Sequence, residues 1–138
     1  DVKDNCDSGQ FIAIQKAAAT ALRDPSIPAD INAKYERRLG KLVSMLQRCG
    51  IECAMPGGSY FLYCKSPRGV EDGPEFPNAE AASQYLITQQ SIVTVPWDDA
   101  GPFLRFSVTY EAADEAAEDA LMADAENRMK QLRLLGPA

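Results

Sequence analysis

The stretch over residues 102–110 constrains the fold most, because apolar and polar side chains alternate along it. Such alternation is typical of a β-strand that buries one face. The buried face would hold Leu104, Phe106, Val108 and Tyr110, and the opposite face would hold Phe103, Arg105, Ser107 and Thr109. The chain must therefore build a sheet and cover one side of it.

Arg105 is the one charged residue of this stretch, and it allows two interpretations. A mid-strand arginine is costly to bury unless its guanidinium reaches water or a carboxylate. In the first interpretation, Arg105 lies on an edge strand and extends to solvent. In the second, it is a two-pronged clamp for a carboxylate, a role for which the planar guanidinium suits arginine better than lysine.

The other elements follow from apolar periodicity, helix caps and chain breakers. Helices are predicted over residues 9–23, 29–49, 79–90 and 113–135, with Asp7 or Ser8 capping the first and Asn78 the third. Strands are predicted over residues 51–55, 59–65 and 92–96, the first two as a hairpin and residues 66–77 as a surface loop. This order predicts an α+β fold, in which a small, mainly antiparallel sheet has helices packed on one face.

The charged residues of the helices are interpreted as structural. The second helix carries five cations that are expected to form a solvated face: Lys34, Arg37, Arg38, Lys41 and Arg48. The last helix has acidic residues near its start and basic residues near its end. That order complements the helix dipole, so no binding patch is predicted from it.

The composition excludes several classes of function. The chain has 138 residues, a hydrophobic fraction of 46% and a net charge of −6, which suits one globular domain rather than a nucleic-acid-binding surface. No apolar run approaches the roughly 18 residues that span a membrane. Histidine, the commonest general base, is absent, so a serine or cysteine triad of the usual kind is not expected.

The cysteines indicate neither a metal site nor a disulfide framework. Cys6, Cys49, Cys53 and Cys64 lack the spacing and the histidine partners of a zinc site. The long helices already supply a core, so stabilisation by disulfides is not expected. We predict free thiols, no bound metal and a cytoplasmic location.

Four segments of the chain occur in the order of one known family. They are residues 4–11 (DNCDSGQF), the helix that ends at Cys49-Gly50, residues 56–63 (PGGSYFLY), and residues 91–96 with 103–107 (SIVTVP and FLRFS). In this order they resemble the C-terminal part of the fold-type I pyridoxal-phosphate-dependent aminotransferases of class I/II, the aspartate aminotransferase-like group. The start of the chain resembles the diaminopimelate-type members in particular. The turn over residues 96–101 (PWDDAG) departs from many members, and this leaves the preferred substrate side chain open.

The resemblance implies roles for two residues. Arg105 would grip the α-carboxylate of the substrate, and Tyr60 would line the substrate site. No residue of this chain would be catalytic or bind the cofactor, because the family's cofactor lysine, its ring-binding aspartate and most phosphate-binding groups lie upstream of the matching segment. The chain alone is therefore expected to be inactive.

The resemblance also implies a domain division. Residues 1–27 would belong to the large domain of the parent enzyme, and residues 28–138 would form the C-terminal small domain with the long linking helix. The parent would use pyridoxal 5'-phosphate to move an amino group between an amino acid and a 2-oxo acid, as a homodimer. The chain by itself is expected to self-associate through an apolar helix face around Phe11 and Ile14. The alternative is a non-catalytic, aminotransferase-like domain that senses a ligand or binds a partner.

Overall fold

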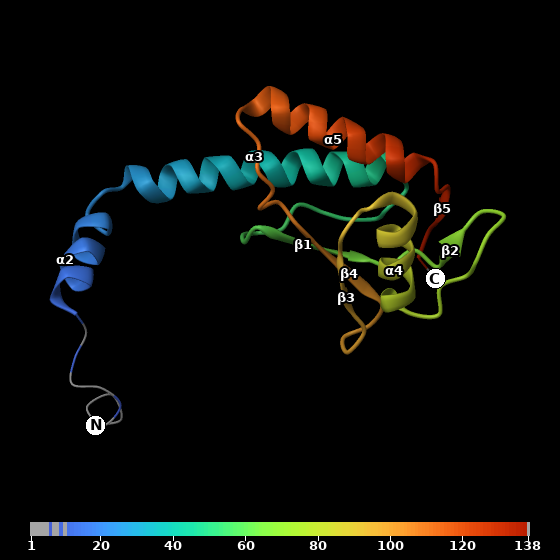
Figure 1. The fold of residues 1–138 in the computed structure, drawn as a ribbon, viewed down its shortest axis with the longest axis horizontal. Helices are drawn as coiled ribbons and strands as arrows, with labels where there is room; N and C mark the ends of the chain where they lie inside the picture. Colours follow the sequence, from blue (N-terminus) through green and yellow to red (C-terminus); the bar gives the residue numbers. More distant parts are fainter. Residues whose placement is uncertain (1–5, 7–8, 10, 138) are drawn as a thin grey trace. The chain divides into compact units, whose positions relative to one another are not determined.

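The computed structural model describes residues 6, 9 and 11–137 (Figure 1). Its helices are α2 (Ile12–Ala21), α3 (Ser26–Arg48), α4 (Ala79–Gln90) and α5 (Glu115–Lys130), and its strands are β1 (Phe61–Lys65), β2 (Gly69–Val70), β3 (Val95–Trp97), β4 (Phe103–Ser107) and β5 (Leu134–Leu135). The chain divides into two compact units, Asp1–Lys34 and Tyr35–Ala138, with the boundary inside α3. The assignment of residues 1–27 to a large domain stays a prediction.

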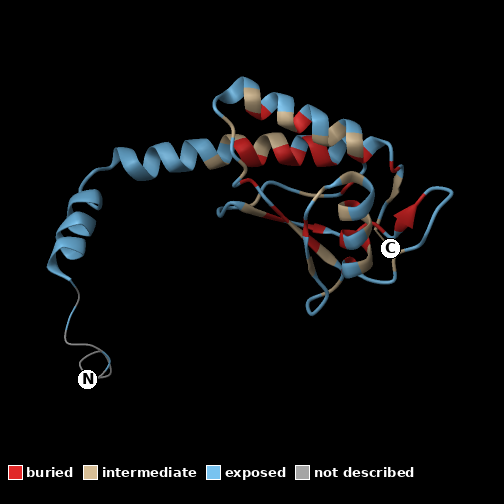
Figure 2. Ribbon diagram, viewed as in Figure 1, coloured by how far each residue is buried: buried red, intermediate tan, exposed pale blue. Residues whose placement is uncertain are grey.

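The second unit contains two small antiparallel sheets. Three strands lie in the order β1-β4-β3, and a separate pair joins β2 to β5. The face of the larger sheet that carries Leu62, Cys64, Leu104 and Phe106 is buried, with each of these side chains at most 5% exposed. Figure 2 shows the buried residues concentrated in the second half of α3, in α4 and in the sheet. The predicted α+β fold is confirmed, including the buried alternate residues of β4.

Side-chain caps fix the starts of two helices. Asn78 accepts a hydrogen bond from the backbone N–H of Ala81 and begins α4, as predicted. At α5, Asp114 accepts from Ala117 in the same way. The start of α3 lies at Ser26, three residues earlier than predicted, and in the turn before it Asp24 accepts hydrogen bonds from the N–H and hydroxyl of that serine.

The predicted hairpin of residues 51–55 with 59–65 is wrong. Residues 51–55 form no strand, and β1 pairs with β4 instead. The reason lies in α3, which supplies the hydrogen bonds that a strand partner would have made. The N–H of Ile51 donates to the carbonyl of Leu46, and the side-chain amide of Gln47 donates to the carbonyl of Cys53 at 2.9 Å.

Two further boundaries differ from the prediction. The last helix ends at Lys130 and not at residue 135. A helix cannot continue through Arg133, whose φ is +48°, and Leu134–Leu135 form the short strand β5. Its partner β2 lies within residues 66–77, which were predicted to be loop throughout. Two-residue strands carry too few side chains for an alternation to be recognised in the sequence.

The first unit contains α2, which starts at Ile12 rather than at residue 9. Gly9 has a φ of +113°, which a right-handed helix does not accommodate. The predicted caps Asp7 and Ser8 lie outside the described residues. No residue of α2 is buried, and Phe11 and Ile14 are 72% and 64% exposed. Self-association through this apolar face stays a prediction.

Candidate functional site

One face of the three-stranded sheet is left open, and Arg105 lies at its centre. The strand β4 is the middle strand, so the first of the two interpretations, in which Arg105 lies on an edge strand, does not hold. Arg105 pairs with Tyr63 on one side and with Val95 on the other. Tyr63, Val95 and Trp97 are 46%, 39% and 41% exposed, which makes this an apolar and aromatic surface.

Two aromatic rings flank the guanidinium of Arg105. Its central carbon lies 4.3 Å from the ring centroid of Phe61 and 6.0 Å from that of Trp97. These rings come from β1 and β3, the strands on either side of β4, and both distances fit a cation–π contact. Among the described residues, no carboxylate forms an ion pair with Arg105 and no side chain or carbonyl accepts a hydrogen bond from it. Its donor fork is therefore open to an external acceptor.

The turn that follows β3 is bonded to the start of α4. Asp98 accepts hydrogen bonds from the backbone N–H groups of Ala79 and Glu80, the first residues of α4, at 2.8 and 3.2 Å. Gly101 closes the turn by donating to the carbonyl of Asp98, and its φ of +115° suits glycine. Trp97 in turn meets the ring of Tyr63 edge-on, with centroids 6.1 Å apart.

Tyr60, the second residue singled out from the sequence, lies beside this group rather than in it. Its ring packs against Tyr35 and Phe61, with centroids 5.6 and 4.5 Å away, and the residue is 43% exposed. The ring that contacts Arg105 is that of Phe61. Strand alternation could have identified Phe61, since it shares the face of Tyr63, whereas the place of Trp97 depends on pairing across β4.

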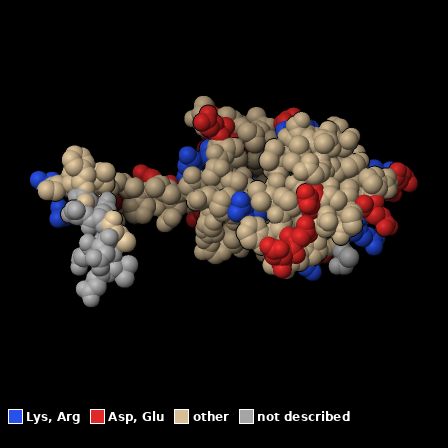
Figure 3. Space-filling view, turned by 60° about the horizontal axis from the view of Figure 1, so that its bottom comes forward, with Lys and Arg blue, Asp and Glu red and all other residues tan. Residues whose placement is uncertain are grey.

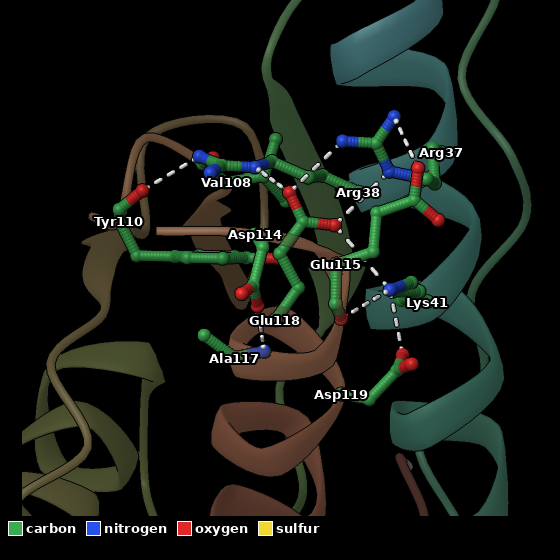
Figure 4. A network of polar contacts seen from close by, with 10 residues as sticks. All are labelled: Arg37, Arg38, Lys41, Val108, Tyr110, Asp114, Glu115, Ala117, Glu118 and Asp119. Carbon is green, nitrogen blue, oxygen red and sulfur yellow. Dashed lines mark hydrogen bonds and ion pairs between the residues drawn. The ribbon is translucent and has the colours of Figure 1, made fainter. Parts of the chain in front are cut away.

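A second group of charges joins α3 to α5 (Figure 4). Glu118 is 2% exposed and accepts hydrogen bonds from the guanidinium Nε atoms of Arg37 and Arg38, at 3.1 and 2.7 Å, while Lys41 Nζ lies 3.3 Å away. The hydrogen bonds from Arg37, then those from Arg38 and Lys41, lower the pKa of Glu118 to about 2, although burial opposes this.

Arg38 also holds the segment that follows β4. Its Nη1 donates to the carbonyls of Val108 and Tyr110, at 3.2 and 2.6 Å, and its guanidinium lies 4.4 Å from the ring centroid of Tyr110. Arg38 is 3% exposed, so the prediction of a solvated face is wrong for this residue. The sequence did contain a signal that one of these cations is buried, because Glu118 is an acidic residue on the apolar stripe of α5 and needs a buried partner.

The remaining polar features carry no site. Among residues 6, 9 and 11–137, no group of three or more His, Cys, Asp or Glu residues is placed to hold a metal ion. Cys64 lies in the core, where burial raises the pKa of its thiol. On the face shown in Figure 3, Lys and Arg lie among Asp and Glu rather than in one basic patch. No helix in the described part of the chain is long and apolar enough to cross a membrane.

Comparison with known proteins identifies the family to which this chain belongs. A family model described as "Aminotransferase class I and II" matches residues 8–120, a range that includes Tyr60 and Arg105. The chain belongs to the class I and II aminotransferase family. It is 45% identical over 139 aligned residues to an LL-diaminopimelate aminotransferase of Methanococcus maripaludis, and 53% identical over 114 residues to one of Methanocaldococcus jannaschii. These alignments cover 97% and 83% of this chain but 33% and 27% of the relatives.

Solved aminotransferase structures share the fold. The substrate-bound BacF structure from Bacillus subtilis aligns with a TM-score of 0.74 and 21% identity, covering 97% of this chain and 32% of that one. The aspartate aminotransferase from Rhizobium meliloti aligns with a TM-score of 0.69 and 21% identity, covering 87% of this chain and 31% of that one. The resemblance to fold-type I aminotransferases is confirmed, and the chain spans about a third of the length of these relatives.

Proposed function

We propose that the protein to which this chain belongs transfers an amino group between an amino acid and a 2-oxo acid, and that Arg105 binds the α-carboxylate of both. The observation that carries the proposal is the open guanidinium on the sheet face, flanked by Phe61 and Trp97 and without an acidic partner among the described residues. A carboxylate that meets this fork with both oxygens would be fixed in position and plane. Such fixation aligns the Cα–H bond for proton transfer.

The relatives support a proposal for the substrate class. The two archaeal relatives described above are LL-diaminopimelate aminotransferases, and the identity to them extends over most of this chain. We infer that the amino donor is a diaminopimelate-like amino acid. Tyr60 would line the substrate site, next to the ring of Phe61 that contacts Arg105.

Pyridoxal phosphate would supply the electron-withdrawing chemistry of the transfer. The described residues do not fit the binding of this cofactor. Lys16, Lys34, Lys65 and Lys130 are exposed, and Lys41 is held by the carboxylates of Glu118 and Asp119. We propose that the cofactor site, and with it the catalytic residues, belongs to a part of the protein outside this chain. The intact protein would act in the cytoplasm as a homodimer.

The test is Arg105→Lys in the longer protein. Lysine keeps the charge but offers a point donor instead of a fork, so kcat/KM should fall about ten- to a hundredfold for the amino acid and the oxo acid together. Binding of the cofactor should hardly change. Equal kcat/KM in variant and wild type would reject the clamp. Activity absent from the wild-type longer protein, with binding of amino acids retained, would favour a ligand-sensing domain.

A further inference from the structure

The edge strand beside Arg105 is held differently at its two ends. Directly before its start, Thr94 is 5% exposed, accepts a hydrogen bond from the hydroxyl of Ser83 in α4 and donates one to it. The strand β3 is three residues long and pairs with β4 alone, and its central residue, Pro96, has no N–H to donate. Trp97 ends this strand and is 41% exposed. The ring that flanks Arg105 on this side is therefore carried by the more exposed end of the strand.

Asp98 links this second end of the strand to α4. Its carboxylate binds the N–H groups of Ala79 and Glu80 at the start of α4, and α4 packs on the sheet through buried residues such as Leu86. Asn78 caps the same helix end through Ala81. The two side chains serve the helix alike, but Asp98 also ties the turn after Trp97 to the helix, whereas Asn78 has no such link.

We propose that Asp98 is a positioning residue for the carboxylate clamp. By tying the turn to α4 it holds Trp97 beside Arg105, and Trp97 together with Phe61 fixes the plane of the guanidinium. A two-pronged contact needs that plane to match the plane of the carboxylate. The inference rests on the proposed function, because it takes Arg105 to be the group that binds the substrate carboxylate.

The kinetic test compares Asp98→Ala with Asn78→Ala in the longer protein. Both variants remove one cap from α4, so a purely structural role predicts similar effects. Positioning predicts that Asp98→Ala raises the KM of the amino acid and of the oxo acid about three- to tenfold. The kcat should stay within about twofold, because the lost contact serves ground state and transition state alike. Asn78→Ala should leave both constants within about twofold.

A second variant keeps the proposal testable if Asp98→Ala folds poorly. Trp97→Ala leaves the link to α4 intact and should raise KM to the same extent. The double variant should be no worse than either single one, since both changes remove the same contact. Fully additive effects would overturn the proposal.

Trp97 also gives a spectroscopic readout, because it is the only tryptophan of the chain. In the 138-residue chain, Asp98→Ala should shift its emission to longer wavelength and increase quenching by acrylamide, and Asn78→Ala should do neither. Equal kinetic or spectral changes in the two variants would reduce Asp98 to a helix cap. If Arg105→Lys lowers kcat/KM but Asp98→Ala does not, the clamp stands and the positioning role fails. If Arg105→Lys has no effect, both fail.

Discussion

Two arginines of this chain lie at almost the same distance from an aromatic ring but differ in their burial and in their hydrogen-bond acceptors. The guanidinium of Arg38 is 4.4 Å from the Tyr110 ring and that of Arg105 is 4.3 Å from the Phe61 ring. Arg38 is buried and its donors are taken by Glu118 and by two backbone carbonyls. Arg105 has no such acceptor in the described part of the chain. The first arrangement serves the fold, and we have proposed that the second binds a ligand.

The largest loss of stability should come from a change in the buried Arg38–Glu118 pair. Glu118→Ala would leave Arg38 buried without its counter-charge, and breaking a buried ion pair in this way costs about 3–5 kcal/mol. The free energy of unfolding, measured with urea, should fall by that amount.

The control is Glu126→Ala on the same helix. Glu126 pairs with Arg48 and Lys130, whose side chains are 53% and 52% exposed and can return to water. This variant should be clearly less destabilised than Glu118→Ala. Equal losses in the two variants would show that the buried network is no different from a surface one.

An intermediate effect should appear as a dependence on pH. The folded-state pKa of Glu118 is about 2, below its ordinary value of 4.5. A lowered pKa means that the stabilisation is complete above pH 4.5 and is lost as the pH falls from about 4.5 to about 2. The slope is about 1.4 kcal/mol per pH unit for one proton.

Glu118→Gln serves as the reference for that slope. It removes the titrating group, so the gap in unfolding free energy between wild type and variant should narrow steadily as the pH falls through this window. A gap that stays constant would contradict the assigned pKa.

The smallest change in stability should come from replacing Arg105 on the open sheet face. Arg105→Leu removes a cation–π contact but leaves no buried acid behind, so the free energy of unfolding should change by less than about 1 kcal/mol. A circular dichroism melt of this variant beside Arg38→Leu gives the contrast directly. If both variants melt alike, the distinction between a structural and a ligand-binding arginine is wrong.

Sequence patterns predicted the features that depend on neighbours along the chain. The alternation in β4 placed Leu104 and Phe106 in the core, and the cap at Asn78 placed the start of α4. The pattern around Arg105 also singled out the residue that lies at the centre of the open sheet face; its role in binding a substrate stays a prediction. These features are local because strand alternation and helix capping involve residues at most a few positions apart.

Features that depend on distant pairing were not predicted. Residues 51–55 look like a strand, yet Gln47 satisfies the carbonyl of Cys53 from α3. Three of the five cations on α3 contact Glu118, but of these only Arg38 is also bonded to the carbonyls of Val108 and Tyr110, which lie 70 and 72 positions further along the chain. The rings of Phe61 and Trp97 meet Arg105 only after three strands have been brought into register, which no single stretch of sequence encodes.

The pairing of β2 with β5 has a consequence for how the domain is made. The pairing joins Gly69 to Leu135, so β2, near the middle of the chain, can pair only after β5, close to the described end, has been synthesised. Contacts between residues this far apart form late, since the entropy of closing the intervening loop is paid before they form. During synthesis, Val70 can reach its buried place only after Leu134 has left the ribosome. Until then an apolar edge stays uncovered, and a nascent chain in that state is open to mispairing with other chains.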